Sequence, residues 1–146
     1  MASKPGRREV LVESDFLFGL RKGDRRHGGV SKALLMHREG VLGISVLSSA
    51  VVEVRTTLYS RGLRFHEVED ALALMDAILS EAEVRDYVPV TLSDVILTER
   101  LRAQFEELTF FDSLHAATSK RVGIPLLSGD PTYKKIGVST MSYEEL

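Results

Sequence analysis

Five acidic residues, spread over most of the chain, follow or interrupt its apolar segments: Glu13, Asp15, Glu53, Asp112 and Asp130. Carboxylates that meet repel one another, and some of them would hold protons unless a cation neutralised the charge. The expected counter-charge is Mg²⁺ or Mn²⁺, because these hard ions prefer oxygen ligands. Such an ion activates water and stabilises developing charge, so these residue types predict metal-assisted attack on a phosphodiester.

The elements that would position these acids alternate between strand and helix. Short apolar, β-rich runs predict five strands, at residues 10–12, 41–47, 86–90, 124–127 and 137–141. Apolar periodicity and capping residues predict helices that begin at residue 16 and at Pro131 and that cover 31–38, 48–62, 65–83, 91–107 and 112–122. This alternation predicts an α/β fold with a mainly parallel sheet of four or five strands and helices on both of its faces.

In open parallel sheets, ligands bind beyond the carboxyl ends of the strands. Glu13 and Asp15 follow the first predicted strand, Asp130 follows the fourth, and Glu53 lies one turn into the helix after the second. Each acid alone has a structural alternative: a helix cap for Asp112 or Asp130, a strand terminus for Glu13 or Asp15, and a salt bridge to an arginine for Glu53. Four separate segments nevertheless deliver acids to one edge of one sheet, which favours a shared site.

Composition narrows the class of protein. The chain has 146 residues, of which 44% are hydrophobic and 27% charged, so we expect one globular domain over residues 9–146 after a flexible basic leader at 1–8. The absence of cysteine excludes disulfide scaffolds, zinc–thiolate sites and thiol nucleophiles. The longest apolar run, 71–75, is too short to span a membrane, and no signal peptide is evident, so we expect a cytoplasmic protein. Asn is absent and Gln occurs once, a depletion typical of a thermophilic source.

Other catalytic signatures are missing from the sequence. No G-x-S-x-G, H-E-x-x-H, G-x-G-x-x-G or Walker A motif occurs. His115 lies three residues after Asp112, a spacing that could serve a relay, but helical histidines are more often packed or solvent-facing. A hydrolase triad is therefore set aside.

The stretch LTFFDSLHAATSKRVGIPLLSGDPTY, at 108–133, combines an aspartate that heads a D-x-x-x-A-A helix with a short strand and a second aspartate. With ISVLSSAVVEV around Glu53 and VLVESDFLF near the N-terminus, the sequence resembles the PIN-domain ribonucleases over residues 10–143. Among them it is most similar to the VapC-like toxins common in archaea and bacteria, and we expect an archaeal source. Asp112, Asp130 and Glu53 match three acidic positions of the family.

The sequence departs from the family pattern at two places. Glu13 stands where the family has its leading Asp, so either the longer Glu13 side chain reaches the metal or Asp15 replaces it as the ligand. Thr132 stands where many members have a further acid, two residues after Asp130. Both departures predict weaker metal binding and reduced activity.

The resemblance implies a PIN-like three-layer α/β/α fold and a Mg²⁺- or Mn²⁺-dependent endoribonuclease that cleaves single-stranded RNA. It further implies a homodimer and an antitoxin partner. The implied catalytic residues are Asp15, Glu53, Asp112 and Asp130, with Glu13 as a further candidate metal ligand. Basic residues near the site are candidate phosphate contacts: Arg21, Lys22, Arg25, Arg26, Lys134 and Lys135.

Two alternatives remain open. One is a PIN-like module that binds RNA or protein and has weakened or lost catalysis. The other is a phosphatase of the haloacid-dehalogenase type, in which ESDFL would correspond to the D-x-D-x-T signature with Glu13 as a poor replacement for the nucleophile.

Overall fold

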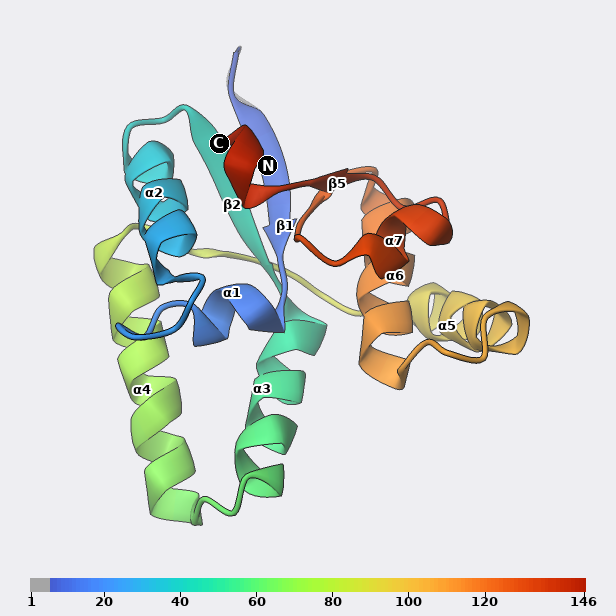
Figure 1. The fold of residues 1–146 in the computed structure, drawn as a ribbon, viewed down its shortest axis with the longest axis horizontal. Helices are drawn as coiled ribbons and strands as arrows, with labels where there is room; N and C mark the ends of the chain where they lie inside the picture. Colours follow the sequence, from blue (N-terminus) through green and yellow to red (C-terminus); the bar gives the residue numbers. More distant parts are fainter. Residues whose placement is uncertain (1–5) are drawn as a thin grey trace.

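The computed structural model describes residues 6–146, through which a five-stranded sheet runs (Figure 1). The strands are β1 (Arg8–Val12), β2 (Leu42–Leu47), β3 (Asp86–Val88), β4 (Leu126–Leu127) and β5 (Thr140–Met141). Their order is β3-β2-β1-β4-β5, and every neighbouring pair is parallel. The predicted α/β class is therefore confirmed, with five strands.

Helices flank the sheet on both sides. They are α1 (Ser14–Phe18), α2 (His27–Arg38), α3 (Ser48–Ser60), α4 (Phe65–Glu81), α5 (Leu92–Gln104), α6 (Phe110–Val122), α7 (Pro131–Lys135) and a short 3₁₀ helix, η1 (Tyr143–Glu145). In Figure 1, α2 and α4 lie to the left of the central strands, whereas α5 and α6 lie to the right. None of the helices within residues 6–146 is long and apolar enough to cross a membrane.

The strand order explains where a site can form. The chain builds outward from β1 through β2 to β3 and then returns to add β4 and β5 on the other side of β1. The direction in which successive strands are added to the sheet therefore switches between β1 and β4, although all strands run parallel. At such a switch point a crevice opens beyond the carboxyl ends of the two strands. Glu13 directly follows β1, and Asp130 lies three residues after the end of β4.

The central strands are buried on both faces. In β1, Val10, Leu11 and Val12 have no exposed surface, and all six residues of β2 are buried. Continuous burial is expected where helices cover both faces of a parallel sheet. It makes the ends of β1 and β2 rigid supports for the side chains that follow them.

Several predicted boundaries differ from the structure. The strands predicted at 86–90, 124–127 and 137–141 are shorter, and Pro89, which cannot donate to a neighbouring strand, follows the end of β3. The helix predicted from residue 31 begins at His27, because Gly28 and Gly29, poor helix formers, are accommodated in its first turn. The helix predicted to reach 107 ends at Gln104. Residues 1–5 of the predicted leader lie outside the described residues, and Arg8 already belongs to β1.

Candidate active site

Glu13 occupies the centre of the site. It directly follows β1, its side chain caps no helix, and only 3% of the residue is exposed. One carboxylate oxygen, Oε2, accepts a hydrogen bond of 2.9 Å from the Tyr133 hydroxyl, whereas Oε1 is buried and has no partner among the described residues. Burial, reinforced by the charge of Asp15, raises the pKa of Glu13 from 4.5 to about 9, against the lowering effect of the Tyr133 hydrogen bond. The carboxyl group is therefore poised to receive a cation or to hold a proton.

Tyr133, which the sequence analysis did not single out, joins two of the acids. Its side chain on α7 is fully buried, and its hydroxyl oxygen lies 3.4 Å from Asp112 Oδ1 as well as beside Glu13. Burial and the charges of Glu13 and Asp112 raise the pKa of Tyr133, so the phenol stays protonated and donates. The sequence signal for this role was a tyrosine, which has a polar hydroxyl, at a position three residues after Asp130 where an apolar side chain would pack equally well.

Asp112 is free of the capping role that the sequence left open for it. Helix α6 begins at Phe110, two residues earlier than predicted, and Thr109 is the N-cap, whose hydroxyl accepts the Asp112 N–H at 3.1 Å. Burial raises the pKa of Asp112, and the charges of Glu53 and Asp130 contribute to the shift. Because those charges act on it, the acids from three separate segments belong to one electrostatic cluster.

Glu53 reaches the cluster through a buried hydrogen-bonded chain. His115 Nε2 lies 2.8 Å from Glu53 Oε1, and His115 Nδ1 lies 2.8 Å from Ser49 Oγ. A carboxylate only accepts, so Nε2 donates to Glu53, and Nδ1 shares a hydrogen bond with the Ser49 hydroxyl. Burial raises the pKa of Glu53, but the hydrogen bonds from His115 and Ser14, together with the charge of His115, outweigh this effect, and the net pKa is lowered.

Two sequence-based interpretations are therefore corrected at this point. The partner of Glu53 is His115 rather than an arginine, and His115 is a buried member of the site rather than an ordinary packed or solvent-facing histidine. The N-cap position of α3 is Leu47, so the Ser49 hydroxyl caps no helix and is left for His115. The i to i+3 spacing from Asp112 to His115 was the only sequence signal for this arrangement.

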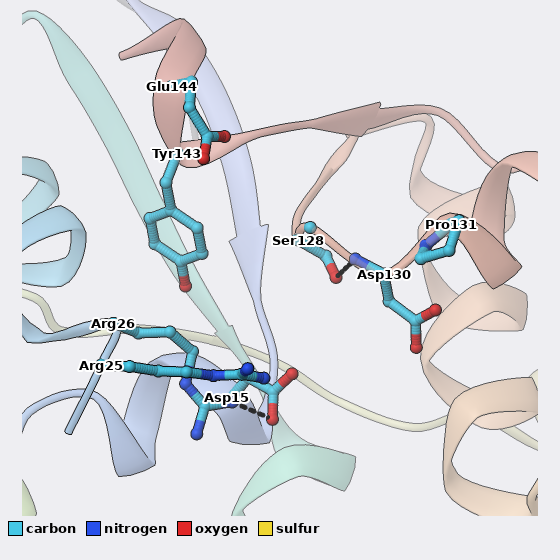
Figure 2. Close-up of a pocket in the computed structure, with 9 residues that line it drawn as sticks. Asp15, Arg25, Arg26, Ser128, Asp130, Pro131, Tyr143 and Glu144 are labelled. Carbon is cyan, nitrogen blue, oxygen red and sulfur yellow. Dashed lines mark hydrogen bonds and ion pairs between the residues drawn. The ribbon is translucent and has the colours of Figure 1, made fainter.

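Asp130 combines a structural and a candidate functional role. As predicted, it is the N-cap of α7 with Pro131 at the first helical position, and its Oδ1 accepts the Thr132 N–H at 2.9 Å. The second carboxylate oxygen is not used by the cap. In Figure 2 the Asp130 side chain points away from the Ser128 turn that precedes it.

Asp15 faces a cleft of about 480 Å³ whose opposite wall includes Asp130 (Figure 2). Its carboxylate pairs with the Arg26 guanidinium, which also pairs with Asp24. Arg25 and Arg26 both line this cleft. The other basic candidates lie outside it: Arg21, Lys22, Lys134 and Lys135 are exposed.

The donor chemistry suits a hard divalent cation, but the side chains hold their own partners. Within residues 6–146, no group of three or more histidine or acidic side chains is arranged so that it could hold a metal ion. Asp15 faces Arg26, Glu53 faces His115, and Tyr133 holds one oxygen of Glu13. The fit to a metal is thus one of chemical type: the ligands are carboxylate oxygens, and the buried Glu13 Oε1, which has no partner among the described residues, is an atom that a cation would satisfy.

Comparison with known proteins assigns the chain to a family. The PIN domain family model matches residues 10–138, and the chain belongs to this family. A search of curated protein sequences finds no match.

Solved structures with the same fold include VapC toxins. VapC20 of Mycobacterium tuberculosis, described as a sarcin–ricin loop cleaving toxin, superposes with a TM-score of 0.68 at 19% identity, over 90% of this chain and 98% of that one. VapBC2 of Rickettsia felis, bound to a promoter DNA fragment, gives 0.67 at 14% identity over 92% and 98%. FitAcB of Neisseria gonorrhoeae gives 0.65 at 17% identity over 94% and 99%. The expected PIN-like fold is confirmed.

Proposed function

We propose that this protein is a Mg²⁺- or Mn²⁺-dependent endoribonuclease that cleaves single-stranded RNA and acts as the toxin of a VapBC-type pair. The observation that carries the proposal is the buried Glu13 Oε1 without a partner among the described residues, beside Asp15 and Asp112, whose charges raise the pKa of Glu13. The charges of Glu53 and Asp130 act in turn on Asp112. Membership of the PIN family supports it, as does the likeness in fold to a toxin described as cleaving the sarcin–ricin loop.

The residues that would hold the metal are Glu13, Asp112 and Asp130, with Asp15 and Glu53 at either side of them. When bound, a divalent ion would supply a water nucleophile of lowered pKa and positive charge for the developing phosphorane oxygens. Glu53, held by the hydrogen bond from His115, would accept a proton at its carboxylate. Tyr133 orients Glu13 through its hydroxyl, and the basic residues would bind the phosphates on either side of the scissile bond.

The partners and location belong to the same proposal. We infer an antitoxin partner because similar folds include VapBC and FitAB assemblies. We propose in addition that the protein is cytoplasmic and forms a homodimer, which sedimentation equilibrium would measure.

The test is cleavage of a labelled single-stranded RNA in Mn²⁺ by the wild type and by Asp112→Asn and Asp130→Asn. We expect each variant to lose at least about a hundredfold in rate, since each removes a candidate metal ligand without a change in shape. Asp70→Asn, an exposed acid on α4, is the matched control and should cleave as the wild type does. Equal cleavage by all four proteins would refute the assignment of the site.

One observation favours a second candidate, a PIN module that binds RNA or protein without cleaving it. The Asp15–Arg26 pair occupies one of the candidate ligands, and Glu13 replaces the family's shorter acid. RNA binding that persists in EDTA, with no cleavage in Mn²⁺ at any pH between about 6 and 9, would establish this alternative. The PIN assignment leaves the haloacid-dehalogenase alternative without support.

A further inference from the structure

The cleft next to the carboxylates has a wall that lies outside the family match. The PIN family model ends at residue 138, but Tyr143 and Glu144 of η1 line the cleft together with Arg25 and Arg26 (Figure 2). The cleft therefore has two sides of different origin. Asp130 and the Ser128 turn form one side, and the C-terminal segment with the loop before α2 and the adjacent Asp15 form the other.

The position of Tyr143 is built into the fold. A Cβ atom on Gly29, in the first turn of α2, would lie 2.8 Å from Cδ1 of the Tyr143 ring, so only glycine permits this close approach. The next residues are also tied to α2, because Lys32 Nζ donates to the main-chain oxygen of Leu146 at 2.5 Å. The ring is thereby held against α2, at the mouth of the carboxylate site.

Three groups with hydrogens to donate meet in this cleft. The Tyr143 hydroxyl oxygen is buried without a partner among the described residues, an arrangement that costs free energy unless a ligand satisfies it. In Figure 2 this hydroxyl points toward Arg25 and Arg26. Arg25 is exposed and forms no ion pair within residues 6–146, whereas Arg26 shares its guanidinium between Asp15 and Asp24. Two guanidinium forks and a phenol are the donor set that a phosphate oxyanion accepts.

We propose that this cleft binds a backbone phosphate of the RNA strand beside the scissile bond, through Arg25, Arg26 and the Tyr143 hydroxyl. This inference rests on the proposed function and adds the residues that seat the substrate. The phosphate replaces Asp15 as a partner of Arg26, so the arrival of the strand frees the Asp15 carboxylate for the catalytic cluster. Tyr143 contributes a neutral hydrogen bond, and Arg25 contributes a charge that responds to salt.

The experiment measures binding of a fluorescent single-stranded RNA by anisotropy in EDTA over a series of salt concentrations. Removal of one phosphate contact from a single strand lowers the slope of log K against log salt by about 0.7, which we expect for Arg25→Gln. Tyr143→Phe keeps the ring against Gly29 and removes only the hydroxyl, so it should weaken binding about tenfold with an unchanged slope. Arg38, an exposed arginine, lies at the C-terminal end of α2, far from the cleft. Arg38→Gln is the matched control and should behave as the wild type does.

Two results would overturn the proposal: equal salt slopes for Arg25→Gln and Arg38→Gln, or wild-type affinity in Tyr143→Phe. Inorganic phosphate, added at constant ionic strength, should not displace the RNA. Displacement that disappears in Arg25→Gln would assign the cleft to a free anion instead. Thermal melting of each variant checks that the fold is intact.

The binding assay is run in EDTA, without metal, so its result is independent of the Mn²⁺-dependent cleavage that tests the proposed function. A protein that shows the expected binding but does not cleave RNA in Mn²⁺ would retain the phosphate subsite and lose the nuclease assignment. Mn²⁺-dependent cleavage that is unchanged in Arg25→Gln and Tyr143→Phe would support the nuclease assignment and refute the phosphate subsite.

Discussion

Glu13 shows how a single buried carboxylate can be held at a cost to the fold. Its neighbours supply one hydrogen bond, from Tyr133, while the nearest charges, Asp15 and Asp112, are negative. A side chain selected for stability alone would carry no charge in this position. Retention of a carboxyl group at the end of β1 is therefore best explained by a ligand that uses it.

The first prediction concerns the stability of Glu13→Gln in EDTA. The pKa of Glu13 is raised by folding, from 4.5 to about 9, so between these values the folded protein binds more protons than the unfolded chain. The stabilising contribution is complete below pH 4.5 and is lost as pH rises toward 9, at up to about 1.4 kcal/mol per pH unit. Glu13→Gln keeps an oxygen for Tyr133 and should remove this slope, so the variant is more stable than the wild type at pH 8.

Urea unfolding at several pH values measures the effect. Glu106→Gln, an exposed glutamate, is the matched control and should retain the wild-type pH dependence. A Glu13→Gln variant with the same pH slope as the wild type would show that Glu13 is ionised in the folded protein at neutral pH.

The candidate acids could be predicted from the sequence because residue type and position relative to the strands are both local signals. Glu53, Asp112 and Asp130 needed only their spacing from predicted strands and helices. Tyr133, Ser49 and His115 could not be found in this way, because their roles depend on contacts such as Ser49 to His115, which are 66 residues apart. Nor could the sequence show that Thr109, rather than Asp112, caps α6.

Helices α5 and α6 are joined by one buried acid that lies away from the candidate active site. Asp94 is 1% exposed and accepts the Thr91 N–H at 3.0 Å, which completes a capping box at the start of α5. From α6, Arg121 Nε donates to it at 2.7 Å and the Thr118 hydroxyl at 3.0 Å. Because Thr118 and Arg121 share a helix with Asp112, this connection helps to fix the helix that carries a catalytic candidate.

Asp94→Ala should destabilise the protein by about 2–3 kcal/mol at neutral pH, since it removes the capping box of α5 and leaves the Thr118 hydroxyl without its buried partner, while the exposed Arg121 returns to solvent. Burial raises the pKa of Asp94, but hydrogen bonds from Arg121, Thr91 and Thr118 outweigh it, and the net pKa is lowered. The contribution is thus present above the unfolded pKa of about 3.9 and is lost as pH falls through the folded value. Urea unfolding from pH 7 to about pH 2 should show the two proteins converging in stability. Asp70→Ala is the exposed control, and a constant difference across this range would contradict the assignment.

Element boundaries were harder to predict than element types for identifiable reasons. The alternation of apolar strands and periodic helices indicated a mainly parallel α/β sheet, and the observed sheet is parallel throughout. The start of α2 was misplaced because Gly28 and Gly29 are typical of loops. Gly29 lies in the helix where Tyr143, 114 positions later, requires the absence of a side chain. A tertiary contact of that range leaves no local pattern.

Charge is distributed over the protein so that acids and bases meet at one crevice. The net charge is only −2, but the crevice beyond β1 and β4 gathers the carboxylates of Asp15 and Asp130 together with Arg25 and Arg26. This polarity suits a phosphodiester, whose phosphate needs the bases while the attack on it needs a metal held by the acids. In the free protein, the ion pair between Asp15 and Arg26 joins an acid of the crevice to a base of the crevice.

A metal that binds this cluster should stabilise the whole fold, because it binds the folded chain and finds no preformed site in the unfolded one. With Mn²⁺ at about a hundredfold excess over its dissociation constant, the expected gain is about 2.7 kcal/mol, which differential scanning calorimetry would register as a rise in Tm of several degrees. Asp112→Asn should lose most of this rise, and Asp70→Asn should keep it. An equal rise in Asp112→Asn would place the bound ion elsewhere, and no rise in the wild type would favour the non-catalytic binding module. Because this measurement needs no RNA, it separates a failure to bind metal from a failure to recognise the substrate.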